Sequence, residues 1–204
     1  LPEILPCYKE RFPNIDLRLV EGNSSTLASA LLHGDVDLVI DMQPFKAENT
    51  ETIPLCEEEI LLAVPDAVLE RTFPGRLEDI KEQLKQHTDL TLLRDCPFLL
   101  INKGNRVRTI ADEAQMTPNV ILETENIETV LGLCIKGMGI TFYPRMFISG
   151  HQEFRQKMQQ QSSPVSFYSL DYAKAHGILA IGYHKGHYMS QATKEFIRIA
   201  KETI

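Results

Sequence analysis

Cysteine is scarce in this sequence and nowhere clustered. The 204 residues contain only four cysteines, without the close pairs of a zinc site or the dense spacing of a disulfide-linked secreted domain. We therefore expect reduced, buried thiols that act as small apolar side chains, and a catalytic thiol is the weaker alternative. The four are Cys7, Cys56, Cys96 and Cys134.

Long apolar runs and clusters of basic residues are also missing. No segment approaches the roughly 18 consecutive apolar residues of a membrane span. The formal net charge is -7, and no stripe of Lys and Arg is present that would neutralise the phosphates of a nucleic acid. The first residues show no basic leader followed by an apolar run. We expect a cytoplasmic protein that is not a membrane protein and does not itself bind DNA through these residues.

Signatures of catalysis and of nucleotide binding are absent too. The chain has no GxxxxGK[ST] or GxGxxG loop, no GxSxG elbow and no HExxH pair. His184 and His187 lie three residues apart near a tyrosine, but Gly186 between them favours a turn, and no third ligand is close in sequence. The sequence therefore predicts neither an enzyme nor a bound metal or cofactor.

Hydrophobic periodicity is strong in the first third of the chain. Apolar residues recur every three to four positions up to Pro13, alternate after it, and return to helical spacing after Ser24 and Ser25, which we expect to cap a helix ended by Gly34. A strand, a helix and a second strand in this order favour a βαβ unit with parallel strands, hence an α/β fold. The predicted elements are helix 1–12, strand 15–22, helix 24–33 and strand 36–42.

The α/β pattern stops after strand 56–65 and then starts again. Residues 66–88 are charged and contain Pro74 and Gly75, and after these the stretch favours an exposed helix that carries Leu77, Ile80 and Leu84. We therefore place a lobe boundary near Pro65. After this stretch the chain has a second half similar to the first. Its predicted elements are strands 97–102, 119–124, 140–144, 165–171 and 177–183, and helices 109–115, 127–136 and 190–204.

Two strand-to-helix corners are candidates for ligand binding. The first contains Ser24 and Ser25, and the second contains Asn126 and Ile127. Free backbone N–H groups and the positive end of the helix dipole favour an anion at such a corner, and ligands of open α/β sheets lie beyond the carboxyl ends of strands. The alternative is that these residues only cap water-exposed helices.

The loop "NKGNRVRT" is a third candidate. It places Lys103, Asn105, Arg106 and Arg108 after a strand of the second half, where cations would meet a small carboxylate. Ordinary surface charge is an equally weighted alternative for Arg106, and helix capping or an ion pair would explain Arg108.

The order of these motifs resembles a known family. The stretch "LPEILPCYKERFPNIDLRLVEGNSSTLASALLHGDVDLVI" and the stretch "NVILETENIETVLGLCIKGMGITFYPR" are similar to parts of the effector-binding domain of LysR-type transcriptional regulators, and so is the closing "LAIGYHKGHYMSQATKEFI". The resemblance covers nearly the whole chain. It rests on many weak matches in the right order, because no single motif is specific.

The resemblance implies a fold and a site. The fold is α/β, with two Rossmann-like lobes joined by two crossing strands, as in type II periplasmic binding proteins. One lobe consists of residues 1–64 and 184–204, and the other of residues 65–183. A small anionic effector is expected in the cleft between them. The implied ligand-binding residues are Ser24, Ser25, Asn102, Lys103, Asn105, Arg106, Asn126 and Ile127.

The resemblance also implies partners. Members pair side by side as homodimers or tetramers through helices such as 1–12 and 127–136, and they bind DNA through a winged helix-turn-helix that is not in this sequence. In the family a strand and a short turn precede the first helix, and stretch 66–88 is longer here than is usual. Two alternatives are a solute-binding protein of a transporter and, less favoured, a two-lobed transferase such as a short ATP phosphoribosyltransferase.

Overall fold

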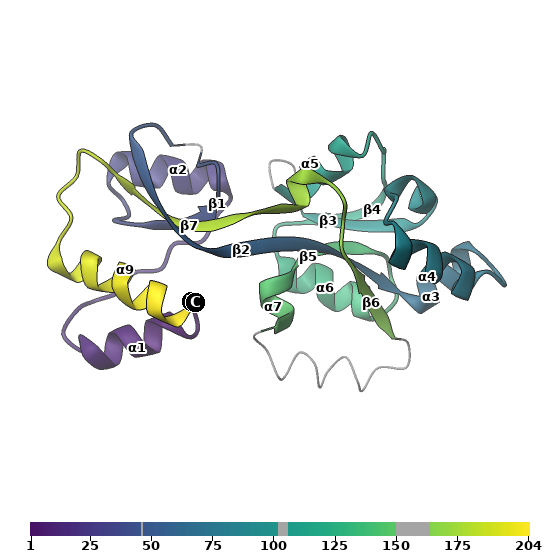
Figure 1. Ribbon diagram of the computed structural model, residues 1–204, viewed down its shortest axis with the longest axis horizontal. Coiled ribbons are helices and arrows are strands. Elements are labelled where there is room, and N and C mark those ends of the chain that lie inside the picture. The colour runs from purple at the N-terminus through teal and green to yellow at the C-terminus, as the bar shows by residue number, and fades with distance from the viewer. Residues whose placement is uncertain (46, 102–105, 150–163) are drawn as a thin grey trace. The chain divides into compact units, whose positions relative to one another are not determined.

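The computed structural model describes residues 1–45, 47–101, 106–149 and 164–204, and it omits the side chains of residues 106–108, 112 and 149. Its elements (Figure 1) divide between two compact units. The first unit is Leu1–Glu57 with Ile178–Ile204, and the second is Glu58–Gly177. The boundaries predicted from the sequence, at Pro65 and at residue 184, lie seven residues after Glu58 and six residues after Ile178. The chain passes between the units within two strands, β2 (Thr50–Pro65) and β7 (His176–His184).

Among its described residues, the first unit contains three helices, strand β1 (Val39–Met42) and parts of β2 and β7. Strand β1 lies antiparallel to β7, with Val39 opposite Gly182. Helices α1 (Ile4–Arg11) and α9 (Gln191–Thr203) lie side by side, and α2 (Ser24–His33) contacts β1.

The core of this unit joins the two ends of the chain. Tyr8 is buried, its ring meets that of Phe196 edge-on at 5.4 Å, and its hydroxyl donates to the carbonyl oxygen of Ala192 at 3.0 Å. Ile4 and Ile181 are buried in the same apolar cluster. Helical spacing of apolar residues on α1 and α9 therefore produces packing between segments that lie more than 180 positions apart.

The predicted strand 15–22 does not form. Residues 16–23 have no assigned secondary structure, and Leu17 and Leu19 are 44% and 58% exposed. A strand needs a hydrogen-bonded neighbour, and β1 is paired with β7 in an antiparallel direction. The predicted parallel βαβ unit in the first part of the chain is therefore wrong.

The second unit contains the strand–helix–strand pattern expected of an α/β protein. Strands β3 (Pro97–Ile101) and β4 (Asn119–Thr124) are parallel, and α5 (Arg106–Glu113) connects them. Strand β5 (Thr141–Pro144) and strand β6 (Val165–Tyr168) each lie antiparallel to β2. The prediction of a parallel pair from residues 97–124 is confirmed, although α5 begins three residues earlier than predicted.

A buried apolar cluster unites these strands. Leu62 lies opposite both Phe142 and Tyr168, and Phe98 meets Phe142 with ring centroids 6.1 Å apart. The remaining elements of the unit cover or extend this core (Figure 1). They are α3 (Asp66–Thr72), α4 (Leu77–Gln86), the 3-10 turns Leu90–Leu93 and Ala173–Ala175, α6 (Ile127–Ile135) and α7 (Arg145–Ser149).

Candidate functional site

The first corner is the N-terminus of α2. Asn23 precedes the helix, and its side-chain oxygen accepts the backbone N–H groups of Ser25 and Thr26, both at 3.0 Å. Ser24 and Ser25, which were predicted as caps, are instead the first two residues of the helix. The cap is Asn23, because its side-chain oxygen accepts the free N–H groups of the first turn. The hydroxyl group of the exposed Ser25 therefore remains available at this helix end.

The second corner is the N-terminus of α6, where β4 has just ended. The Asn126 side-chain oxygen accepts the backbone N–H of Thr129 at 3.0 Å, and the Asn126 N–H donates to the Thr124 hydroxyl at 3.3 Å. Asn126 is exposed, and Ile127, the first helical residue, is half-buried. Asn126 therefore caps the helix, which was the alternative to ligand binding in the sequence analysis. Its side-chain NH₂ remains a potential hydrogen-bond donor.

The structure adds to the second corner a carboxylate that was not predicted from the sequence. Glu128, in the first turn of α6, is exposed, and its Oε1 accepts the hydroxyl of the buried Tyr143 at 3.1 Å. Burial, reinforced by the Glu128 charge, raises the pKa of Tyr143, so the phenol stays a donor at neutral pH. This corner therefore presents an acceptor and a negative charge as well as N–H donors.

The described residues include only part of the basic loop. Asn102, Lys103 and Asn105 lie outside the described residues. Arg106 is the first residue of α5, and its side chain is outside the described part of the chain. The predicted role of this loop in binding an anion therefore stays a prediction.

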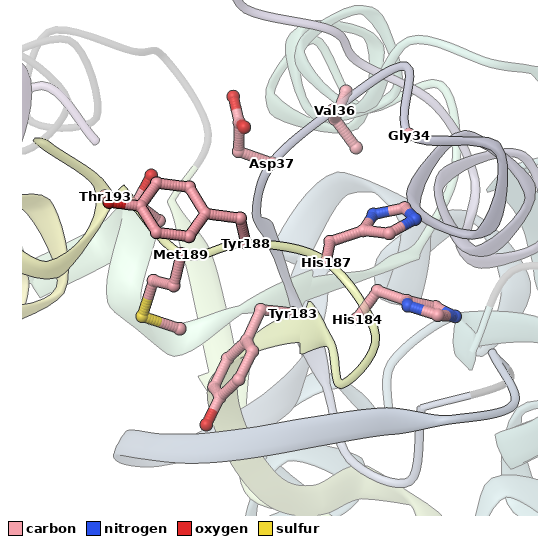
Figure 2. Close-up of a pocket in the computed structure, with 9 residues that line it drawn as sticks. All are labelled: Gly34, Val36, Asp37, Tyr183, His184, His187, Tyr188, Met189 and Thr193. Atoms are coloured by element: carbon pink, nitrogen blue, oxygen red, sulfur yellow. The ribbon is translucent and has the colours of Figure 1, made fainter. Parts of the chain in front are cut away.

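A pocket lies on the first unit, and none of the residues that line it was predicted from the sequence to bind the effector (Figure 2). In this pocket the rings of His184 and His187 lie at a tilt with their centroids 4.3 Å apart. The Asp37 carboxylate is directed away from both rings. The pocket has a volume of ≈ 40 Å³, which is enough for about three water molecules at 10–15 Å³ each. The lining residues are Gly34, Val36, Asp37, Tyr183, His184, His187, Tyr188, Met189 and Thr193.

Hydrogen bonding restricts what the histidine pair can bind. The Gly186 N–H donates to Nδ1 of His184 at 3.1 Å, so that nitrogen must carry a lone pair and the ring proton sits on Nε2. Metal binding through Nε2 would require the proton to move and the turn to lose this bond. Among the described residues, moreover, no three His, Cys, Asp or Glu side chains are grouped to hold a metal ion.

Gly34 is required where the His184–His187 turn meets the end of α2. Its φ of +76° is left-handed, and an added Cβ would lie 3.3 Å from Cε1 of His187. We expect Gly34→Ala to lower the free energy of unfolding by about 1–2 kcal/mol through backbone strain, measured by urea denaturation. Gly75, with φ +73° and no atom within 4 Å of its Cβ position, is the matched control.

The exposed imidazole of His187 can move, so Gly34→Ala and Gly75→Ala should cost similar amounts. Only Gly34→Ala should shift the NMR signals of the His187 ring. A loss at Gly34 several times that at Gly75 would mean that the turn is held rigidly against α2.

The cysteines differ in environment. Burial raises the pKa of the Cys96 thiol to about 11 and that of Cys134 to about 12, so both are protonated and unreactive at neutral pH. Cys56 is half-buried and Cys7 is exposed, so the expectation of four buried thiols is wrong for Cys7. Neither buried thiol has the lowered pKa of a catalytic nucleophile.

The helices of the described chain are too short or too polar to cross a bilayer. The longest, α9, has 13 residues.

Comparison with known proteins identifies relatives along the whole chain. Residues 1–204 match the family described as the LysR substrate binding domain. The uncharacterized HTH-type transcriptional regulator YcgK of Bacillus subtilis strain 168 is 26% identical, with 100% of this chain and 62% of YcgK covered. The chain thus spans less than two thirds of this curated relative.

Solved structures share the fold. The C-terminal domain of a probable LysR family transcriptional regulator from Rhodococcus sp. RHA1 aligns with a TM-score of 0.72 at 19% identity, covering 98% of this chain and 91% of that one. The effector binding domain of QuiR in complex with shikimate aligns with a TM-score of 0.71 at 17% identity, covering 98% and 88%. The predicted α/β fold of LysR effector-binding domains, similar to type II periplasmic binding proteins, is confirmed.

Proposed function

The chain belongs to the LysR substrate-binding domain family, and we propose that it senses a small anionic effector bound by groups of the α2 and α6 corners. The match of all 204 residues to one family of regulatory, non-enzymatic domains carries the general function. The predicted absence of enzymatic activity is confirmed by this family assignment, and the transferase alternative is set aside.

The two corners support different parts of such an effector. The α2 corner offers the exposed hydroxyl of Ser25 at a helix N-terminus and has no acidic residue in its first turn, which favours a carboxylate or phosphate. The α6 corner combines the donor NH₂ of Asn126 with the Glu128 carboxylate. An acceptor there favours hydroxyl or ammonium groups. We therefore propose an effector that carries an anionic group and several hydrogen-bond donors.

QuiR is bound to shikimate in its solved structure, and shikimate has one carboxylate and three hydroxyl groups. This combination matches the chemistry of the two corners. Shikimate is thus a suitable first probe for this chain, together with other hydroxylated carboxylates and amino acids.

The whole protein is proposed to be a transcription regulator of the cytoplasm. YcgK is named an HTH-type regulator, and about two fifths of its length has no counterpart in this chain. We propose that a helix-turn-helix part of the full protein binds DNA, and that homodimers or tetramers are the working form. Differential affinity of the effector for two arrangements of the protein would then shift their populations. A solute-binding role would need export instead, and the HTH-type relatives argue against it.

A thermal-unfolding screen tests effector binding. A ligand that binds only the folded state stabilises it by about 2.7 kcal/mol at a hundredfold excess over Kd, which raises Tm by about 5–10 °C for a domain of this size. We expect at least one hydroxylated carboxylate or amino acid to give a saturable shift. Ser25→Ala and Asn126→Ala should each reduce that shift, whatever their effect on the unliganded protein.

The ligand-induced shift is the quantity to compare, since loss of the Asn126 cap alone costs about 1 kcal/mol. Ser29→Ala is the matched control, because Ser29 is exposed on the same helix but lies beyond its first turn. A shift that persists in both corner variants would place the effector elsewhere. A shift weakened equally by Ser29→Ala would point to a general effect on α2.

A further inference from the structure

Glu58 is a buried acid at an unusual position in the chain. It lies in β2, where the strand enters the second unit, and it is only 6% exposed to solvent. Its neighbours on the strand, Glu57 and Glu59, are exposed and half-buried respectively. A carboxyl group at this depth normally needs a partner for each oxygen.

Only one oxygen of Glu58 has such partners. Oε1 accepts the backbone N–H of Glu59 at 2.8 Å and that of Met146, in α7, at 3.3 Å. Oε2 is inaccessible to solvent and has no hydrogen-bond partner in the described part of the chain. Glu58 therefore joins β2 to the start of α7 through one oxygen and leaves the other without compensation.

The nearest cation is engaged elsewhere. Arg145 lies 2.6 Å from Oε2 of Glu59 and also donates to the Ser169 hydroxyl at 3.3 Å. Among the described residues, Arg145 on α7 is the charged group that acts on Glu58, and the adjacent strand residues Glu57 and Glu59 point to the opposite face of β2. Burial raises the pKa of Glu58, and the backbone N–H groups and Arg145 only partly oppose this effect.

We propose that Glu58 is a proton-binding site that couples the attachment of β2 to α7 to pH. When Glu58 is ionised, a negative charge is buried with one oxygen unsatisfied. Protonation removes that charge while Oε1 keeps its backbone partners. The N–H groups of Glu59 and Met146 favour the ionised carboxyl, but the burial that opposes them is the larger effect. The proton therefore stabilises the folded arrangement of β2 and α7 by removing a buried charge, and it changes the strength of the Glu58–Met146 hydrogen bond.

The sign of the pH effect follows from the two states. The folded protein keeps the Glu58 proton to a higher pH than the unfolded chain, whose carboxyl titrates near 4.5. The penalty for ionised Glu58 is absent below 4.5 and is fully present above the folded-state pKa, so this residue's contribution to stability falls as pH rises through that window.

Side-chain ¹³C NMR of the intact 204-residue chain tests the site directly. The Glu58 carboxyl signal, identified by its loss in Glu58→Gln, should titrate above 4.5. The backbone amide signal of Met146 should move with the same midpoint. In urea denaturation, the midpoint of the unsubstituted protein should rise relative to that of Glu58→Gln as pH is lowered from 8 to 5.

Glu59→Gln is the matched control, because Glu59 is adjacent on the strand and paired with Arg145. This variant should leave the midpoints of the Glu58 and Met146 signals above 4.5. A Glu58 carboxyl that titrates at or below 4.5 in the unsubstituted protein would overturn the proposal, even if Glu58→Gln fails to fold. A Met146 amide that does not follow Glu58 would overturn the coupling to α7.

Discussion

Gly139→Ala is expected to lower the free energy of unfolding by about 3 kcal/mol, the upper part of the range for overpacking in a core. A Cβ at this position would lie 2.7 Å from the carbonyl oxygen of Pro97 and 3.0 Å from Cγ of Leu99. The Pro97 oxygen accepts the N–H of Ile140 at 2.8 Å. The obstacle is therefore backbone that holds β3 beside the start of β5, and it cannot rotate away.

Gly132→Ala is the matched control for this substitution. Gly132 lies in α6 of the same unit, and no atom lies within 4 Å of its Cβ position. Alanine there should stabilise the helix by up to about 1 kcal/mol. Urea denaturation of both variants should give effects of opposite sign. A loss below about 1 kcal/mol for Gly139→Ala would show that the packing around Gly139 is looser than its contacts indicate.

Asp66→Ala is expected to cost about 2–3 kcal/mol. The Asp66 carboxylate accepts from Nζ of Lys81 at 2.8 Å, and the two side chains are only 13% and 17% exposed. The hydrogen bond to Asp66 raises the pKa of Lys81, so the lysine stays charged at neutral pH. Removing the carboxylate leaves that charge poorly solvated between α3 and α4, which is the main source of the loss.

A double-mutant cycle separates this effect from lost packing. Lys81→Met in the Asp66→Ala background should recover part of the stability, because the exposed Glu78 at 3.9 Å only weakly compensates the remaining charge. The exposed pair of Arg76 and Asp79 in the same segment is the control, and Asp79→Ala should cost much less stability than Asp66→Ala, because water solvates both charges. Strictly additive losses at Asp66 and Lys81 would mean that the pair is not coupled.

Local sequence signals predicted much of the second unit. The spacing of Leu77, Ile80 and Leu84 predicted α4, and Ile80 and Leu84 are buried against the core. Helix α3 was missed, because its seven residues directly after Pro65 are too few for a clear period. Strand 15–22 was predicted from alternation alone, which indicates the fit of side chains but not whether a neighbouring strand is present.

The candidate site shows the same division. Helix ends are marked by short-range residues, and both corners were found, although the cap of α2 is Asn23 rather than a serine. The contacts between Tyr143 and Glu128 and between Glu58 and Met146 join positions 15 and 88 residues apart. Such pairs depend on how elements pack and leave no local pattern in the sequence, so only the structure reveals them.

The first unit is built from two separate segments of the chain, and this has a consequence for its folding during synthesis on the ribosome. Helix α1 packs on α9, and β1 pairs with β7, so residues 1–57 lack their partners until residues 178–204 have been made. The second unit lies between these segments, and translation at about 5–20 residues per second takes roughly 6–24 s to cross it. The continuous second unit can thus fold first, while the apolar face of α1 waits for the last helix to emerge.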